Sequence, residues 1–354
     1  MKNILVPSIS LMAMGLVACS SGTPVTPASP DAAPWSYESV AGTLGDLSCP
    51  NGAAEGFAMS FVMAAEPVEL GEDDKVADAL TGLSFRAGWA LDAPLASFGG
   101  LSGLDILPGG DLLAVSDAGA LVAIPFDQEA LVPRGQATLT YLRNQDGEVL
   151  TGKADADAEG LHVRDGAAFV SFERNHRVAA YAFDRCGGNA AAVPIARMGD
   201  RPTGLGRSIS ENSGSEGLVM MDDALLVGIE TLTGGKGPIG RVTEAGGISF
   251  AGTNWVDAEG APLVGLDEAG GRLYSLHRAY NPLLRQNTIS IRVRSQEGET
   301  KTLAFMGAPL ALDNFEAIAV MPLASGEDRI FILSDDNFSD NQRTLLYVFE
   351  TVRD

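Results

Sequence analysis

The sequence predicts an all-β protein that folds as a single β-propeller, with six blades of about four strands each and a ring closed by the C-terminal strand. Glycine makes up 42 of the 354 residues, above the usual share of roughly 7%. Long segments with a helical period are hard to find after residue 80, and short apolar runs between turn signals take their place. A strand-based motif also repeats about every 50 residues, which is typical of propeller blades.

Each repeat begins with a small acidic or polar residue, followed by Gly-Leu or Ala-Ile, a short strand, a Gly/Asp turn and a second strand that ends in polar residues. The anchor positions are Gly103, Gly160, Gly217, Gly265 and Ala317, at spacings of 57, 57, 48 and 52 residues. We expect the sixth blade between about residues 50 and 92, with an edge strand at 82–92 that pairs near the C-terminal strand at 344–351. A pair of β-sandwiches is the alternative, but it predicts no such period.

The N-terminal segment is expected to lie outside the fold. Residues 1–18 have the charged start and apolar stretch of a secretory signal peptide. The sequence Leu-Val-Ala-Cys at 16–19 resembles a bacterial lipobox, which implies cleavage before Cys19 and lipidation of its thiol; Ser20 favours the outer membrane, facing the periplasm or the exterior. Residues 19–34 are then a flexible tether, and residues 35–354 form the domain. The alternative is an ordinary cleaved signal in which Cys19 is incidental.

Charge and cysteine content narrow the possible partners. The net charge of −22 argues against nucleic acid, because nucleic-acid binding needs a basic face. Apart from Cys19, the cysteines are Cys49 and Cys186, which are candidates for a disulfide in an oxidising compartment. Two buried free thiols are the alternative. No Cys-x-x-Cys or Cys/His cluster is present, so zinc or redox chemistry is not expected at these residues.

Equivalent positions of the repeats should form rings around the central channel. The position before each anchor holds Ser102, Glu159, Glu216, Val264 and Glu316. The polar end of the second strand holds Asp117, Glu173, Glu230, His277 and Asp335. Converging carboxylates must share protons, pair with arginine or bind a cation, and hard oxygen ligands favour Ca²⁺. The alternative is that these acids cap turns or pair with Arg174, Arg177, Arg278 and Arg343.

Three loops carry further candidate ligands. Asp-Asn-Phe occurs at 313–315 and again at 336–338, so Asn314 and Asn337 are candidate ligand-binding residues. These loops can instead form Asx-turns that satisfy their own backbone. Residues 155–160, Asp-Ala-Asp-Ala-Glu-Gly, superficially resemble a calcium loop, but the glutamate that an EF-hand needs at its twelfth position is replaced by Gly166.

The ordered set of motifs resembles the phytase-like family, which is often labelled "esterase-like activity of phytase" and consists of secreted bacterial proteins expected to be propellers. The matching segments are GGLSGLDILPGGDLLAVSDA at 99–118, EGL at 159–161 and 216–218, VSFERNHRV at 170–178, HRAYNPL at 277–283, DNFEAIAV at 313–320 and SDDNFSDNQRTLLYVFE at 334–350. They cover most of the chain after about residue 80. The sequence departs from the family pattern at Ala118 and Ala317.

The resemblance implies hydrolysis of esters, phosphate esters among them. The converging carboxylates lead us to expect calcium in the channel, where it would assist that reaction. In that mechanism Glu159, Glu216, Glu316, Asp335 and Asp336 hold metal. The candidate catalytic residues are Glu216, His277, Arg278 and Arg174, and the candidate ligand-binding residues are Asp117, Glu173, Glu230, Asn314 and Asn337. No Gly-x-Ser-x-Gly elbow or P-loop offers another mechanism. The alternatives are a non-enzymatic propeller that binds a ligand or a protein with structural calcium, and a lactonase-like propeller.

Overall fold

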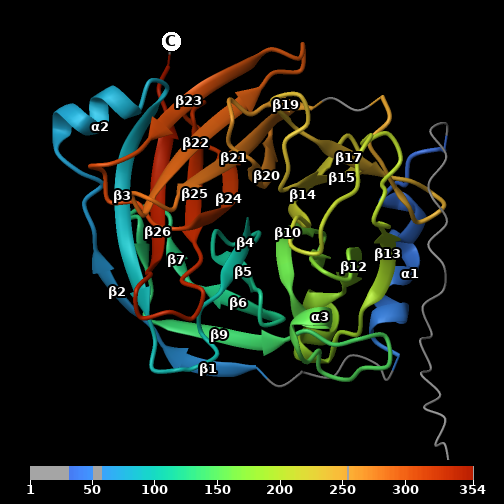
Figure 1. Ribbon diagram of the computed structural model, residues 1–354. Coiled ribbons are helices and arrows are strands. Elements are labelled where there is room, and N and C mark those ends of the chain that lie inside the picture. Colours follow the sequence, from blue (N-terminus) through green and yellow to red (C-terminus); the bar gives the residue numbers. More distant parts are fainter. Residues whose placement is uncertain (1–31, 51–57, 253–254, 354) are drawn as a thin grey trace, which may run out of the picture.

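Five β-sheets of four or five strands surround a common centre in the computed structural model, which describes residues 32–50, 58–252 and 255–353 (Figure 1). The innermost strands of these sheets contact one another in a closed ring, in the order β4, β10, β14, β20 and β24. The predicted all-β propeller is therefore confirmed. The predicted number of blades is wrong, because the described residues form five blades and not six.

Three blades begin the ring. Blade 1 contains β4 (Leu101–Ile106), β5 (Leu112–Ser116), β6 (Ala120–Ile124), β9 (Gln136–Tyr141) and, at its outer edge, β1 (Met59–Val62). Blade 2 contains β10 (Ala158–Arg164), β11 (Ala167–Phe172), β12 (Arg177–Tyr181) and β13 (Val193–Arg197). Blade 3 contains β14 (Ser215–Met221), β15 (Ala224–Ile229), β17 (Ile239–Val242) and β18 (Ile248–Ser249).

Two further blades complete the ring. Blade 4 contains β20 (Leu263–Ala269), β21 (Arg272–Asn281), β22 (Gln286–Arg294) and β23 (Thr300–Met306). Blade 5 contains β24 (Phe315–Pro322), β25 (Asp328–Ser334), β26 (Thr344–Thr351), β3 (Leu83–Asp92) and β2 (Ala64–Pro67). Two small sheets pair β7 (Phe126–Asp127) with β8 (Val132–Pro133) and β16 (Lys236–Gly237) with β19 (Val256–Asp257). The helices are α1 (Glu38–Ser48), α2 (Asp73–Ala79), α3 (Lys153–Ala156), α4 (Phe183–Cys186) and the 3-10 helix η1 (Gly187–Asn189).

The segment expected to form a sixth blade instead completes two other blades. Strand β3 pairs along its length with β26, so the C-terminal strand closes the ring as predicted. Strand β2 pairs with the other side of β3, and β3 is therefore not the edge strand that the sequence suggested. Strand β1 adds to the outer edge of blade 1. The buried side chain of Met63 separates β1 from β2, so this short stretch joins the outer edges of blades 1 and 5.

Residues 32–50 run along the outside of blades 3 and 2. The Trp35 amide donates to the Val242 carbonyl of blade 3 at 3.0 Å. The rings of Trp35 and Tyr37 both meet Phe169 of blade 2 edge-on, with centroids 6.0 Å apart in each pair. After α1, Cys49 forms a disulfide with Cys186, which ties the helix to blade 2. Of the two alternatives left open by the sequence, the structure has the disulfide.

The hydrophobic core is divided among the gaps between neighbouring blades. Five clusters of buried apolar side chains fill the five interfaces among the described residues. For example, Phe331 of blade 5 packs with Phe126 of blade 1, with ring centroids 5.3 Å apart. Each sheet therefore buries both faces only because two other sheets flank it, as expected for a propeller.

The inner strands approach one another most closely at the anchor positions. A Cβ atom on Gly103 would lie 2.5 Å from the Glu159 carbonyl oxygen of the next blade. A Cβ atom on Gly160 would lie 2.8 Å from the Glu216 carbonyl oxygen, and a Cβ atom on Gly265 would lie 2.9 Å from the Glu316 carbonyl oxygen. Glycine recurs at this position of the repeat because a side chain would push the blades apart.

We expect the disulfide to stabilise the domain through the long loop that it closes. Its cysteines are 137 residues apart in the sequence, and loss of a native disulfide typically costs about 2–5 kcal/mol. The double variant Cys49→Ser/Cys186→Ser should lose free energy of unfolding of that order in urea denaturation. Reduction of the wild-type protein should give the same midpoint as the double variant, and an unchanged midpoint in both would contradict the prediction.

Candidate functional site

A bulge at one position of every blade directs side chains into one end of the channel. The pairing of the first strand with the second shifts in register between Leu101 and Gly103 in blade 1 and at the corresponding place in the other four blades. The residues at these bulges are Ser102, Glu159, Glu216, Val264 and Glu316. A bulge re-aims the side chain that it carries. The repeat thus delivers three glutamates to one place, as the sequence predicted.

The end of each second strand supplies the other half of the site. In each blade, we consider the last residue of the second strand that pairs with the first strand. The residues that directly follow it in blades 1 to 5 are Asp117, Glu173, Glu230, Arg278 and Asp335. Together with Asp157, the four acids among these residues and the three bulge glutamates form what we call the acidic cluster. Its members are Asp117, Asp157, Glu159, Glu173, Glu216, Glu230, Glu316 and Asp335; Glu230 is half-buried and the others are buried.

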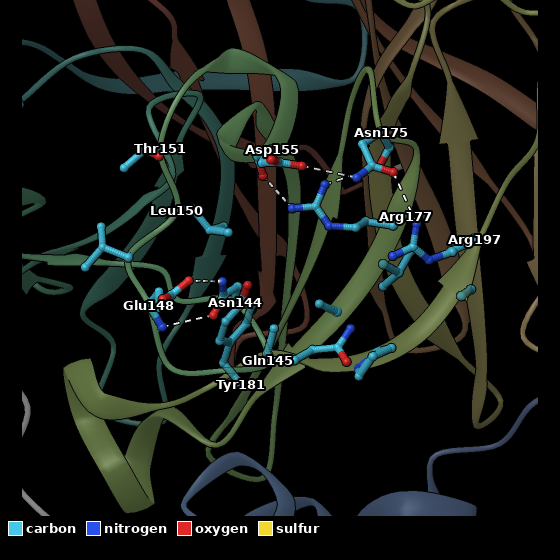
Figure 2. Close-up of a pocket in the computed structure, with 16 residues that line it drawn as sticks. Asn144, Gln145, Glu148, Leu150, Thr151, Asp155, Asn175, Arg177, Tyr181 and Arg197 are labelled. Carbon is cyan, nitrogen blue, oxygen red and sulfur yellow. Dashed lines mark hydrogen bonds between the residues drawn. The ribbon is translucent and has the colours of Figure 1, made fainter. Parts of the chain in front are cut away.

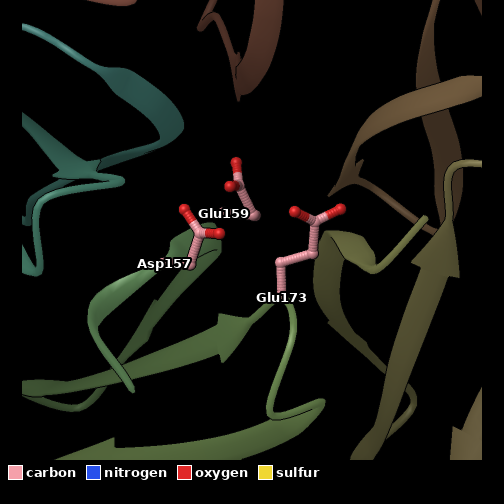
Figure 3. A group of neighbouring side chains, drawn as sticks. All are labelled: Asp157, Glu159 and Glu173. Carbon is pink, nitrogen blue, oxygen red and sulfur yellow. The ribbon is translucent and has the colours of Figure 1, made fainter. Parts of the chain in front are cut away.

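Three of these carboxylates, all from blade 2, lie close enough together to share a metal ion. Asp157, Glu159 and Glu173 each offer an oxygen, and the three oxygens lie within 4.8 Å of one another (Figure 3). Asp157 precedes β10, Glu159 lies on the bulge and Glu173 follows β11. Asp157 was not among the predicted site residues, although the calcium-like pattern at 155–160 was a signal for it.

Three cations contact the cluster and leave part of its charge unmatched. Lys153 Nζ lies 2.8 Å from Asp117 Oδ2 and 3.3 Å from Asp157 Oδ1. Arg174 Nε lies 2.6 Å from Asp157 Oδ2. Arg278 Nη2 lies 3.3 Å from Glu230 Oε1 and 3.0 Å from Glu316 Oε1. Among the described residues, no ion pair involves Glu159 or Glu216. Pairing with arginine therefore accounts for some of these acids but not for all.

Burial and mutual repulsion hold protons on the cluster. Burial, reinforced by the charge of nearby carboxylates, raises the pKa of Glu159 and of Glu216 well above the usual value. The same causes raise the pKa of Glu173 to about 7 and that of Asp335 to about 8. Without a cation, several of these groups are thus protonated near neutral pH.

The cluster fits a hard divalent cation such as Ca²⁺. The ligands are carboxylate oxygens, which Ca²⁺ prefers. Asp117 Oδ1 and Asp157 Oδ1 are buried and accept no hydrogen bond from the described residues, although Asp157 Oδ1 also lies near Lys153 Nζ. Buried oxygens of this kind are otherwise satisfied in folded proteins. The carboxylate oxygens of Asp117, Asp157, Glu159 and Glu173 are accordingly those best placed to hold a metal.

Other predicted ligands have structural contacts. Asp336 accepts hydrogen bonds from the Gly100 amide at 2.9 Å, the Phe338 amide at 3.0 Å and the Thr344 hydroxyl at 3.0 Å, so both of its carboxylate oxygens are occupied. Asn314 Nδ2 donates to Glu316 Oε1 at 2.8 Å and thus orients a cluster member.

The side chain of Asn337 is not brought to the cluster. This side chain is exposed and donates to Gln342 at 3.3 Å. Its backbone amide donates to Asp335 Oδ1 at 2.6 Å, as in the Asx-turn alternative.

The histidine predicted at the ring position of blade 4 is also not brought to the cluster. His277 pairs with Leu263, and Arg278 is the residue equivalent to Asp335 and Glu173 in the other blades. The His277 ring is buried against Ser275 Oγ at 2.9 Å and the Ala261 carbonyl at 3.1 Å, and burial lowers its pKa to about 4. Successive residues of a strand face opposite sides, so Arg278 faces the acids and His277 does not.

A cavity of about 920 Å³ adjoins the cluster between blades 4 and 5. Arg278 and Asn314, which both contact Glu316, belong to its lining. Tyr280, Arg285 and Asn287 also line it, and Asn287 Oδ1 is buried with no hydrogen-bond partner among the described residues. The cavity offers polar and cationic groups next to the carboxylates, an arrangement suited to a polar or anionic small molecule.

Comparison with known families fits this geometry. The phytase-like family, described as "esterase-like activity of phytase", matches residues 96–338, which span all of the acidic cluster. The chain belongs to the phytase-like family. No curated protein sequence matches it.

The solved structures similar to this phytase-like chain share little sequence with it. The PQQ-bound aldose sugar dehydrogenase from Streptomyces coelicolor is 11% identical, with a TM-score of 0.39 over 81% of this chain and 98% of that chain. The calcium structure of a Trichoderma reesei carbohydrate-active enzyme of family AA12 is 10% identical, with a TM-score of 0.41 over 85% of this chain and 98% of that one. A protein of unknown function from Dyadobacter fermentans is 10% identical, with a TM-score of 0.41 over 85% and 97%. Likenesses this low carry no argument about function.

We expect the stability of the metal-free protein to fall as pH rises from about 5 to about 8. The folded state keeps protons on Glu173 and Asp335 up to pKa values of about 7 and 8, whereas the unfolded chain loses them near pH 4. The folded state therefore binds more protons than the unfolded state in this window, so the free energy of unfolding decreases with pH. Melting curves with a chelator present should record this fall.

The double variant Glu173→Gln/Asp335→Asn serves as the control for that measurement. It removes both titrating groups, so its melting temperature should depend less on pH between 5 and 8 than that of the wild-type protein. Identical pH dependence of the two proteins would show that these carboxyls do not titrate as described.

Proposed function

We propose that this phytase-like propeller is a Ca²⁺-dependent hydrolase of small esters or phosphoesters, held in the cell envelope by a lipid on Cys19. The observation that carries the proposal is the acidic cluster itself. Eight mostly buried carboxylates lie with three cationic side chains at one end of the channel, beside a cavity that Arg278 lines. Carboxyl groups with strongly shifted pKa values next to a cavity are typical of functional sites.

Asp157, Glu159 and Glu173 are the residues that would hold the metal, with Asp117 beside them. Calcium bound there would neutralise the carboxylates, polarise an ester or phosphoryl oxygen and lower the pKa of a coordinated water. The chain's own groups supply the rest of the chemistry. Arg174 and Lys153 hold Asp157 in place through ion pairs of 2.6 and 3.3 Å.

Glu216 is the best candidate for a proton acceptor. It is buried, it has no ion pair among the described residues, and burial raises its pKa, which makes its carboxylate a stronger base. Arg278 would bind an oxygen of the substrate. Its Nε is buried and has no hydrogen-bond partner among the described residues, while its Nη2 is fixed by Glu230 and Glu316.

An anionic substrate must overcome the net charge of −22. Arg278 and Arg285 line the cavity beside the cluster, and a bound cation would make the local field more positive. A positive electrostatic potential at the cavity is enough, because the potential there depends more on nearby charges than on the net charge of the chain.

The proposed lipid anchor depends on the N-terminal sequence. Cys19 and the signal segment lie outside the described residues. Within the described part of the chain, no helix has the length and apolar character needed to cross a membrane. We propose that the membrane is reached through the acylated Cys19, at the outer membrane, with residues 19–34 as the tether.

A non-enzymatic propeller with structural calcium is the second candidate. The ion pairs of Lys153, Arg174 and Arg278 favour it, because they already stabilise part of the cluster without a ligand. Propellers host both enzymes and binding proteins, so the fold does not choose between them.

Calorimetric titration of the chelator-treated protein with Ca²⁺ should detect binding of one or a few ions. The variant Glu159→Gln should weaken that binding at least tenfold, since it removes a charged ligand from the group of three. The exposed acid Glu129 provides a control, and Glu129→Gln should bind as the wild type does. Absence of binding by the wild-type protein would exclude both candidate functions in their calcium-dependent form.

The variant Glu216→Gln should separate the two candidate functions. If Glu216 accepts a proton in catalysis, ester or phosphoester turnover in the presence of calcium should fall by roughly 100-fold or more, while the melting temperature is kept or raised. Nitrophenyl acetate and nitrophenyl phosphate are suitable first substrates. A variant that only melts at a lower temperature, with turnover intact, would remove the main support for the enzyme.

A further inference from the structure

A second cavity lies in blade 2, away from the acidic cluster. It has a volume of about 400 Å³ and is bounded by β12 and β13 on one side and by the loop at 144–151, between β9 and α3, on the other (Figure 2). None of the cluster carboxylates lines it. The mechanism proposed above does not use it.

Two neighbouring arginines face this cavity. Arg177 of β12 and Arg197 of β13 are directly paired across the two strands, and both line the cavity. Among the described residues neither makes an ion pair with a carboxylate; Arg197 Nη1 donates to Asn175 Oδ1 at 3.3 Å, and Arg177 donates to the Asn175 and Asp155 carbonyl oxygens. Two adjacent positive charges repel each other, and a bound anion would relieve that repulsion.

The guanidinium groups have donors to spare and a fixed position. A guanidinium carries five N–H donors, of which the bonds above use two in Arg177 and one in Arg197. The Arg177 guanidinium stacks 3.8 Å above the centroid of the Phe172 ring, which restrains it. Arg177 is half-buried and Arg197 is exposed, so an anion could reach both from solvent.

A buried hydroxyl without a partner lies in the same cavity. Tyr181 is only 2% exposed, lines the cavity and has no hydrogen-bond partner for its hydroxyl among the described residues. It lies four residues after Arg177 on β12, so both side chains are on the same face of the strand. A buried hydroxyl normally finds a partner, and an oxygen of a ligand would provide one.

Small side chains leave the space open, and the nearby acids are engaged elsewhere. Ala179 lies between Arg177 and Tyr181 on the same face of β12 and pairs with Pro194 of β13. Of the acids in the lining, Asp155 Oδ1 accepts from Asn175 Nδ2 at 3.2 Å, and Glu148 Oε2 accepts from Asn144 Nδ2 at 3.2 Å. Each of these two carboxylates therefore has one oxygen held by a neighbouring amide, and neither is ion-paired with Arg177 or Arg197 among the described residues.

We propose that this cavity is a binding site for a small oxyanion, a carboxylate or a phosphate group, held by Arg177, Arg197 and Tyr181. Guanidinium groups match the geometry of both anions. The site is separate from the acidic cluster and from the cavity at Arg278, and it does not depend on calcium.

Calorimetric titration of the full chain, with a chelator present, tests the proposal with two probes, inorganic phosphate and succinate. At least one should bind at low ionic strength with a stoichiometry of one at this site. Arg197→Gln should weaken that binding at least tenfold. Tyr181→Phe should weaken it severalfold, because it deletes only the hydroxyl.

The matched control is Arg285→Gln, in the cavity beside the acidic cluster. It should leave the Arg197-dependent binding in place. Binding that is lost in Arg285→Gln but kept in Arg197→Gln would overturn the proposal, as would no binding of either probe. Binding of neutral glucose instead of either oxyanion, lost in Arg197→Gln, would also overturn it. Because the chelator removes calcium, these outcomes are independent of whether the hydrolase proposal holds.

Discussion

The close approach of the inner strands at the anchor positions is the constraint on which the site depends. At Gly103, Gly160 and Gly265 the chain passes so near the next blade that a Cβ would lie within 3 Å of its backbone. In each case the nearby atom is the carbonyl oxygen of the bulge residue of that next blade, a glutamate each time. A narrow ring therefore fixes where the bulges lie, and the bulges fix where Glu159, Glu216 and Glu316 converge.

That convergence opposes folding, and the blade interfaces compensate for it. Burial and repulsion raise the pKa of the cluster acids, so the folded state stores unfavourable electrostatic energy or holds extra protons. The five apolar interfaces and the pairing of β26 with β3 keep the ring closed against this repulsion. Natural proteins accept such local conflicts mainly at functional sites, which is why the cluster carries the proposed function.

The sequence predicted what repeats and missed what does not. The 50-residue period predicted the propeller, and the residue before each anchor predicted the bulge glutamates, because both are properties of every blade. The number of blades could not be read from length, because residues 59–92 add strands to blades 1 and 5 and build no new one. The sequence predicted His277 at the ring position that Arg278 occupies. Strand register is set by pairing between strands, and an error of one residue moves a side chain to the opposite face of the sheet. Asp157 precedes β10 at a position that the repeat does not define, so it did not follow from the pattern. The Cys49–Cys186 disulfide was one of two alternatives that the cysteine count left open, because a contact between residues 137 apart cannot be read from a local pattern.

One turn of the chain serves both proposed sites. Directly after β11, Glu173 and Arg174 belong to the acidic cluster and its ion pairs, while Asn175 of the turn and Arg177 at the start of β12 line the cavity of blade 2. The facing segment divides in the same way, because Asp157 contacts Arg174 whereas Asp155 bonds to Asn175. The turn and the facing segment thus place Glu173, Arg174 and Asp157 at the acidic cluster. They place Asn175, Arg177 and Asp155 at the cavity. The left-handed φ of 53° at Arg174 turns the backbone at the boundary between the two groups of residues, so the separation of the two sites is built into the loop that connects the strands.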